Sequence, residues 1–255
     1  MPKPPDSRRP SRLSHRTSTV SVPRSGRART VPAAAHVHTA APPTARERIL
    51  EAAVSVFGRR GFRDATVREI SREAGVGLGL MNYHFGDKER LYAAVLEHLF
   101  SAAFSRYPAE ATPSRQHPPA ECLRNLVHAI LGRLIGDTGL YRTDRGGCLL
   151  AMEMANPSPA MDEVIQRYIR PQKEALVVVV GALLGPAAKR DPWRLQCCAL
   201  SVAAQCLHYA YARSLIDRLV FPSARPGDRL DLLTEHITEF SLGGIRAVRE
   251  GRGRS

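Results

Sequence analysis

Residues 66–87 read TVREISREAGVGLGLMNYHFGD, and this stretch decides the fold. Thr66 and Glu69 have the spacing of a capping box, which predicts that a helix begins directly after Thr66. Gly75 suits the left-handed position that ends such a helix, and a second short helix is expected at about residues 78–83. Two short helices joined by a glycine-containing turn are typical of a helix-turn-helix, whose second helix enters the major groove of DNA.

A helix is expected on each side of this pair. Upstream, residues 44–47 (TARE) form another capping box, and the apolar residues after them repeat at the spacing of an amphipathic helix. We expect Gly58 and Gly61 to end that helix. Downstream, Asp87 is a typical N-cap and predicts a fourth helix at about residues 88–106.

The helical pattern continues beyond a proline-rich loop to the end of the chain. The dipeptides Ser-Pro at 158–159 and Asp-Pro at 191–192 are helix start signals, and the second is expected to open a segment that runs to about residue 220. Pro171 should kink or split the segment that begins at 158–159, and Asp228 should begin the last helix. No segment alternates like a strand. We therefore predict an all-α fold, with an N-terminal three-helix helix-turn-helix DNA-binding domain followed by a larger helical ligand-binding and dimerisation domain.

The N-terminal tail differs from the rest of the chain. It contains no Ile, Phe, Trp or Tyr, so it cannot bury enough apolar surface to order itself. The tail holds eight basic residues and only one acidic residue, Asp6. Its positive charge is therefore over half of the net charge of +13, so the net charge of the chain says little about the folded part. A passive extension, sequence-independent phosphate contact, a targeting segment and a mis-called start codon are open alternatives. The predicted domains are a disordered basic tail at 1–43, the helix-turn-helix domain at 44–92, the effector-binding and dimerisation domain at 93–250 and a disordered tail at 251–255.

Several functional classes find little support in the sequence. The five cysteines fall in apolar helical stretches, which favours reduced core thiols, and a metal site at Cys197, Cys198, Cys206 and His208 would lack CxxC spacing. Glycines 75, 77 and 79 lack the spacing of a dinucleotide loop, so we expect no cofactor and no metal. No apolar run reaches the ~18 residues of a membrane span. There is also no nucleophile elbow, P-loop or placed acid pair, so we do not expect an enzyme.

The helix-turn-helix carries groups suited to DNA. Asn82 can pair with an adenine edge, and Tyr83 and His84 can donate to phosphates. Lys88 stands at a helix start beside the expected groove. Thr66 and the free amides that follow it form a second phosphate site. For Tyr83 and His84, packing of the recognition helix on its neighbours is the alternative role.

The stretch 46–96, with the block GVGLGLMNYHFGDKERL, closely resembles the DNA-binding domain of TetR-family regulators. Gly77, Leu78 and Leu80 depart from the family pattern, because many members have hydroxyl or charged residues there. These losses make contact between Leu78 or Leu80 and thymine methyl groups the expected apolar readout. The resemblance implies DNA contacts at Thr66, Gly77, Leu78, Gly79, Leu80, Asn82, Tyr83, His84 and Lys88, and Arg68 is a further candidate for a DNA contact.

The C-terminal part, about residues 119–213, resembles the CecR-type branch of the same family. This resemblance implies that the last two long helices pair with a second subunit in a four-helix bundle, and that the preceding helices enclose a ligand cavity. The alternative for the pocket candidates is that they are satisfied core residues. These candidates combine sulfur or polar groups with helices expected to be mostly buried: Met152, Met154, Tyr168, Gln205, His208 and Tyr209.

These patterns predict a ligand-responsive DNA-binding transcriptional regulator. We expect a cytoplasmic, nucleoid-associated homodimer that acts as a repressor on a palindromic operator in double-stranded DNA and is released by a small-molecule effector. Its partners would then be operator DNA, a second copy of the chain and the effector, with no membrane. The alternatives are a basic nucleoid protein without sequence preference and an enzyme. Binding to operator and to random duplex at controlled salt distinguishes the nucleoid protein from the regulator.

Overall fold

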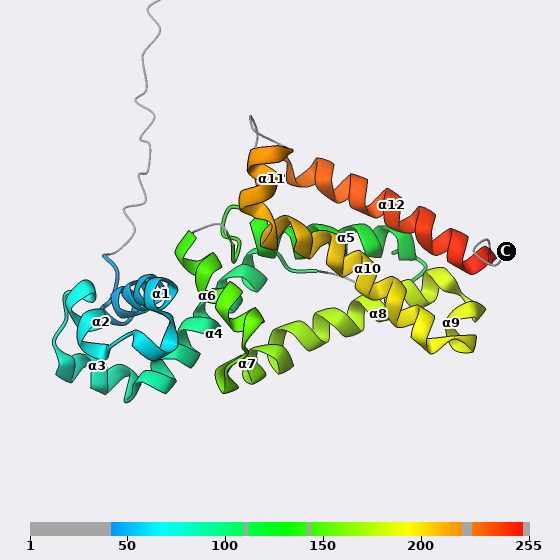
Figure 1. Ribbon diagram of the computed structural model, residues 1–255. Coiled ribbons are helices and arrows are strands. Elements are labelled where there is room, and N and C mark those ends of the chain that lie inside the picture. The colour runs from blue at the N-terminus through cyan, green and yellow to red at the C-terminus, as the bar shows by residue number, and fades with distance from the viewer. Residues whose placement is uncertain (1–41, 110–111, 142–143, 221–225, 252–255) are drawn as a thin grey trace, which may run out of the picture. The chain divides into compact units, whose positions relative to one another are not determined.

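The computed structural model describes residues 42–109, 112–141, 144–220 and 226–251. Most of the two predicted tails, 1–43 and 251–255, lies outside this part. Within these ranges every regular element is a helix and no strand occurs, as the sequence predicted (Figure 1). No helix there is long and apolar enough to cross a membrane. The elements are α1 (Ala45–Asp64), α2 (Val67–Ala74), α3 (Leu78–Phe85), α4 (Lys88–Arg106), α5 (Pro119–Ile135), α6 (Asp144–Ala155), α7 (Pro159–Val164), a π-helical turn η1 (Ile165–Ile169), α8 (Arg170–Leu184), α9 (Pro186–Arg190), α10 (Pro192–Tyr211), α11 (Arg213–Leu219), a 3-10 turn η2 (Pro226–Arg229) and α12 (Leu230–Glu250).

Helix α1 begins as predicted but ends later. The Thr44 hydroxyl accepts from the Glu47 amide at 3.2 Å, and the Glu47 carboxylate accepts from the Thr44 amide at 2.8 Å, which completes the capping box. We expected Gly58 to end this helix, and that prediction is wrong. Gly58 is a buried residue inside the helix. Gly61, with a φ of 74°, interrupts the helix, and a last turn then runs on to Asp64.

The helix-turn-helix forms at the expected place. The Thr66 hydroxyl caps α2 by accepting from the Glu69 amide at 3.2 Å, but the Glu69 carboxylate does not return to complete the box and lies 3.7 Å from Arg60 instead. Gly75 ends α2 in the left-handed conformation, with a φ of 64°. Asp87 caps α4 by accepting from the amide of Arg90. Helix α1 packs against α2 and α4, and α3 packs on α2 and α4.

In the C-terminal part, the buried helix α5 packs against α8, α10 and α12. Pro171 splits its segment as predicted, since a π-helical turn precedes α8 and the proline lies in the first turn of α8. Asp191 caps α10, which ends at Tyr211, and α11 then carries the helical segment on to Leu219, close to the expected end at about residue 220. Ser158 makes no side-chain cap, because its hydroxyl donates to Glu153.

Candidate DNA-binding surface and effector cavity

The recognition helix α3 has one buried and one exposed face. Met81 and Phe85 are buried in the core, and they anchor the helix through apolar packing. On the other face Tyr83 is 82% exposed, and Leu78 and Leu80 are 42% and 39% exposed. These three large side chains all stand on one short helix, and exposed apolar side chains that gather on one face are typical of an interaction surface.

The ten predicted DNA-contacting residues lie at the start of α2, along α3 and at the start of α4. His84 and Lys88 are half-buried, and a Cβ added to Gly77 or Gly79 would meet nothing within 4 Å, so the start of α3 is open to a partner backbone. The exposed members are Thr66, Arg68, Gly77, Leu78, Gly79, Leu80, Asn82 and Tyr83.

The Lys88 side chain makes its contacts within the protein. Its Nζ donates to the main-chain carbonyls of Arg63 and Ala65, both at 3.2 Å, and lies 4.6 Å from the centroid of the Phe62 ring. These carbonyls lie at and just beyond the end of α1. Lys88 therefore joins the end of α1 to the start of α4, a role that the sequence did not indicate.

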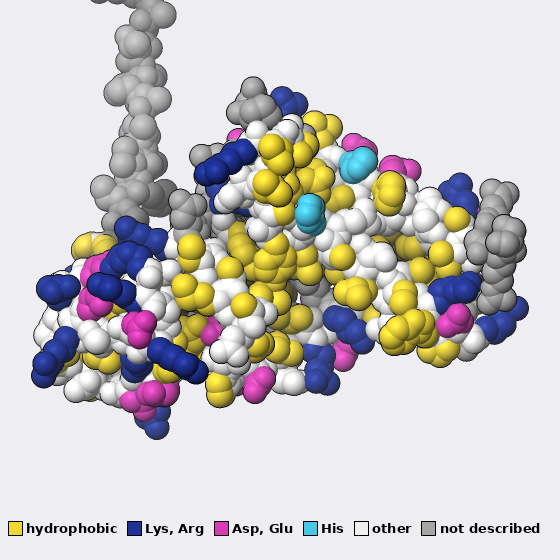
Figure 2. All heavy atoms as spheres, viewed as in Figure 1, with side chains coloured by type: hydrophobic (Ala, Val, Ile, Leu, Met, Phe, Trp, Pro, Cys, Tyr) yellow, Lys and Arg dark blue, Asp and Glu magenta, His cyan; other side chains and the backbone are white. Residues whose placement is uncertain are grey.

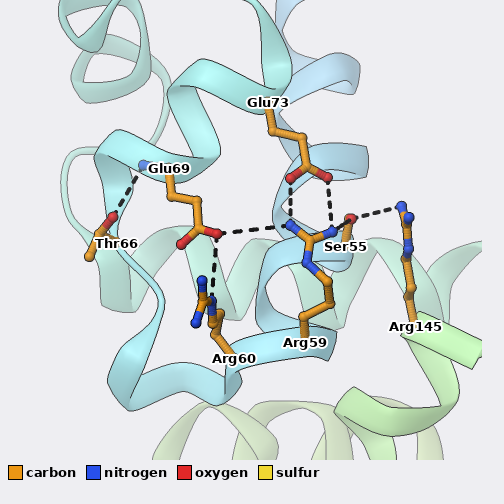
Figure 3. Close-up of polar contacts among 7 residues, drawn as sticks. All are labelled: Ser55, Arg59, Arg60, Thr66, Glu69, Glu73 and Arg145. Atoms are coloured by element: carbon orange, nitrogen blue, oxygen red, sulfur yellow. Dashed lines mark hydrogen bonds and ion pairs between the residues drawn. The ribbon is translucent and has the colours of Figure 1, made fainter.

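A polar network joins α1, α2 and α6 (Figure 3). The Arg59 guanidinium donates to both carboxylate oxygens of Glu73, at 3.3 and 2.6 Å, and to the Ser55 hydroxyl at 2.5 Å. Arg145 of α6 donates to the same hydroxyl at 2.8 Å. The hydrogen bond from Arg59 lowers the pKa of Glu73 below its ordinary range. The network orients α2 on α1 and connects α1 with the C-terminal part.

A second link joins α4 and α6. The Tyr92 hydroxyl donates to the carboxylate of Glu153, which is buried and also accepts from the amide and hydroxyl of Ser158. Burial is the main cause that raises the pKa of Tyr92, followed by the bond to Glu153. This buried cluster is satisfied by its own members, so it fixes α6 and α7 on α4.

The C-terminal part contains a cavity of about 400 Å³, which lies in the range of small-molecule sites. Most of its walls are apolar, and Phe100 and Phe104 of α4 contribute aromatic surface. The remaining lining residues are Ile130, Arg133, Leu134, Leu140, Tyr141, Leu150, Met154, Met161, Ile169, Gln172, Lys173, Leu176, Gln196, Ala199, Leu200, Ala203, Leu207 and Tyr211.

The six predicted ligand residues are not brought together. Met154 lines the cavity. Met152 lies near Gly61 of α1, whereas the Tyr168 hydroxyl donates to Glu97 at 2.6 Å. The other three stand on α10: Gln205 donates to Ser241 of α12, His208 is exposed and Tyr209 borders a separate small pocket.

Sequence reasoning missed Arg133, the buried charged residue of the cavity wall. It is 6% exposed, and burial lowers its pKa to about 10. A signal was present, because Arg133 lies three residues after Ile130 and seven after Leu126 and so falls in the apolar stripe of α5. A charged residue at such a position calls for a special environment.

The outward faces of α10 and α12 are apolar. Trp193, Leu200 and Tyr211 on α10 are 79%, 66% and 44% exposed, and Leu232 and Phe240 on α12 are 58% and 68% exposed. Leu200 and Tyr211 also line the cavity, so the exposed stripe of α10 adjoins it. Each set recurs at multiples of the helical spacing and so forms a stripe. Figure 2 shows hydrophobic side chains over both helices on this face. Among the described residues no cluster of metal-ligating side chains forms here or elsewhere.

Comparisons with known proteins agree with this architecture. The family model described as bacterial regulatory proteins of the tetR family matches residues 49–95, which contain α2 and α3. The model described as the C-terminal domain of the HTH-type transcriptional dual regulator CecR matches residues 119–245. Both matches follow the division between the recognition helices and the cavity-bearing helices.

Individual relatives match over short stretches of the chain. The HTH-type transcriptional repressor NicS of Pseudomonas putida is 38% identical over 82 residues, which is 32% of this chain and 38% of NicS. The HTH-type transcriptional regulator BetI of Brucella anthropi is 40% identical over 57 residues, which is 22% of this chain and 29% of BetI. The matched region thus spans well under half the length of either relative.

A solved transcriptional regulator from Rhodococcus sp. Rha1 shares the fold. It superposes with a TM-score of 0.53 and 22% identity, over 79% of this chain and 97% of that one. Taken with the two family models, these findings identify the chain as a member of the TetR family of bacterial regulatory proteins, with a CecR-type C-terminal domain.

Proposed function

We propose that this chain is a DNA-binding transcriptional repressor that acts as a homodimer and is released from a palindromic operator by a small-molecule effector. The observation that carries the proposal is the exposed face of α3, which presents Leu78, Asn82 and Tyr83 on a helix anchored by buried side chains. A rigid helix with exposed base-reading groups is what major-groove recognition requires. Operator DNA would place the protein in the cytoplasm, at the nucleoid.

The exposed residues divide by the chemistry of their contacts. Asn82 would read an adenine edge, and Leu78 and Leu80 would contact thymine methyl groups. Arg68 and Tyr83 would contact phosphates, which position the protein without reading sequence. This division makes Asn82 the main hydrogen-bonding reader of sequence in α3.

The dimer would form through the apolar stripes of α10 and α12. Both stripes expose large side chains, and two such helices from each of two subunits make a four-helix bundle. A twofold dimer of this kind presents two copies of α3, so its operator would be a pseudo-palindrome with half-sites about one helical turn apart. The family membership supports the same assembly.

Helices α4 and α6 would carry the effector signal. Leu150 and Met154 of α6 line the cavity, and Glu153 between them is bonded to Tyr92 of α4. The other end of α6 reaches α1 through Arg145 and Ser55. An effector that displaces α6 would therefore change the position of α1 and α4, and so the spacing of the two recognition helices.

Genomic footprinting of the full chain tests this proposal. We expect a small set of occupied sites that share a pseudo-palindromic sequence, with occupancy lost when the regulated genes are induced. Even occupancy that follows DNA accessibility, with no shared sequence, would contradict it and favour binding without sequence preference.

A further inference from the structure

The cavity described above holds an unusual charged group. Arg133 projects from the last turn of α5, and its guanidinium lies 3.9 Å from the centroid of the Phe104 ring. Its Nε donates to the main-chain carbonyl of Tyr107 at 2.9 Å, and its Nη1 donates to the side-chain carbonyl of Gln172 at 2.5 Å. Both acceptors are neutral, so a buried positive charge is held without a counter-charge from either.

The rest of the cavity wall does not supply that counter-charge. Lys173 is the second cationic residue of the wall, and no Asp or Glu occurs among the described residues that line it. Nor does any carboxylate of the described residues form an ion pair with Arg133. Burial of an uncompensated charge is costly, and it is most easily offset by an opposite charge that enters the site.

The guanidinium also has donors to spare. A guanidinium carries five N–H groups, and the two hydrogen bonds to Tyr107 and Gln172 leave three of them. No acceptor for Nη2 lies within hydrogen-bond distance in the described part of the chain. The unused donors are on the end of the guanidinium, where the planar fork matches the two oxygens of a carboxylate.

Building on the proposed function, we infer that the effector is a mainly hydrophobic molecule with a single carboxylate, and that Arg133 binds this carboxylate inside the cavity. The apolar walls, with the rings of Phe100 and Phe104, would hold the hydrophobic body. A single carboxylate fits one buried guanidinium, and Lys173, which is exposed, would attract the anion as it enters.

The same residue offers a route for the signal. The Tyr107 carbonyl that Arg133 holds is at the C-cap of α4, and the Tyr107 ring packs so closely on α5 that a Cβ on Gly132 or Gly136 would overlap it. A carboxylate bound to the unused donors would draw the guanidinium towards the cavity and so weaken the hydrogen bond from Nε to the Tyr107 carbonyl. The end of α4, the helix that begins beside α3, would then be free to shift.

Titration calorimetry on the full chain without DNA tests the inference. The probes are the straight-chain carboxylates from hexanoate to dodecanoate and 2-naphthoate, each compared with its primary amide. At the chain length that fits, we expect the carboxylate to bind about 10- to 100-fold more tightly than its amide, because a charge-assisted hydrogen bond replaces a neutral one.

Three variants assign that preference to a residue. In Arg133→Gln the preference for the carboxylate should fall below about 3-fold while the affinity of the amide stays the same, which also shows that the cavity has kept its shape. Arg133→Lys should retain at least a third of the preference. Arg124→Gln, which removes an exposed charge of α5 outside the cavity wall, should change it by less than about 3-fold.

The inference is wrong if no carboxylate binds the wild-type chain, if every acid and amide pair binds equally, or if the preference survives in Arg133→Gln. Should that variant fail to fold, the acid and amide pairs on the wild type and on Arg133→Lys still decide. A carboxylate preference in a protein that shows no operator specificity would leave this site intact and refute the proposed function. Specific operator binding with no carboxylate preference would refute only the effector class.

Discussion

Gly58 of α1 lies directly against the main-chain carbonyl of Arg145 in α6, with no room for a side chain between them. The two helices pack over an extended surface, and the Arg145 side chain reaches Ser55 one turn before Gly58. This contact joins the helix-turn-helix to the helix that lines the cavity. It is thus the contact through which a change in α6 would move α1.

We expect Gly58→Ala to separate α1 from α6. The added Cβ would overlap main-chain atoms, which cannot rotate away, so the free energy of unfolding should fall by about 1 to 3 kcal/mol despite the better helix propensity of alanine. Urea denaturation measures this change. Gly181→Ala in α8 is the matched control, since its nearest neighbour would be 3.8 Å away, and it should be neutral or stabilising. Equal effects of the two substitutions would show that the contact with Arg145 is unimportant.

Substitutions of Lys88 and Arg68 should have different effects, the first on stability and the second on DNA binding. Lys88→Met removes two hydrogen bonds to main-chain carbonyls, so it should lower the free energy of unfolding by about 1 kcal/mol and leave the salt dependence of operator binding unchanged. Arg68→Met should instead lower the slope of log K against log salt by about one per subunit. If Lys88→Met flattened the salt dependence of operator binding and left stability unchanged, Lys88 would instead be a phosphate-contacting residue.

The Arg59–Glu73 pair should make stability depend on pH. Because the pKa of Glu73 is lowered from its ordinary value of 4.5, its carboxylate stabilises the folded state above about pH 4.5, and this contribution is lost as the pH falls through the lowered pKa. Glu73→Gln should therefore be less stable than the wild type at pH 7, with the difference shrinking towards pH 3. Glu51→Gln, an exposed change on α1, is the control. A difference that is constant with pH would contradict the assignment.

The apolar stripe on α12 should hold the dimer together. Phe240→Glu places a charge at a position that is 68% exposed in the single chain and would be buried between subunits. Analytical ultracentrifugation should then find a monomer, and operator affinity should fall by about 100-fold because only one half-site is bound at a time. Val178→Glu on α8, at 56% exposure, should leave the dimer intact. A dimeric Phe240→Glu would place the interface elsewhere.

Local signals in the sequence predicted much of the helical framework. The Thr44 box, the left-handed Gly75 and the Asp191 cap are confirmed, because each depends on residues within one helical turn. Gly58 and Gly61 looked alike as helix ends, yet one lies inside the helix and the other interrupts it. Gly58 is required by the close approach of the Arg145 main chain, far along the sequence, which a local pattern cannot reveal.

The DNA-binding surface and the cavity also differ in how well local sequence signals predicted them. The proposed DNA-facing residues all lie within residues 66–88, so one motif could propose them together, although their contacts with DNA stay predictions. The cavity is built from helices distributed across α4 to α10, and only Met154 among the proposed residues lines it. His208 was expected on a buried helix, but it is exposed because α10 turns that face outward. Arg133 was detectable only as a charged residue in the apolar phase of α5.

The most direct test of the account is the specificity of DNA binding. Sites selected from random duplexes by the full chain should share a pseudo-palindrome, and at fixed salt the selected site should bind at least about 1,000-fold more tightly than random duplex. Asn82→Ala should cost roughly 1 to 3 kcal/mol and relax the preference at one base pair in each half-site. A ratio near one, or an Asn82→Ala protein with unchanged sequence preference, would contradict recognition by α3.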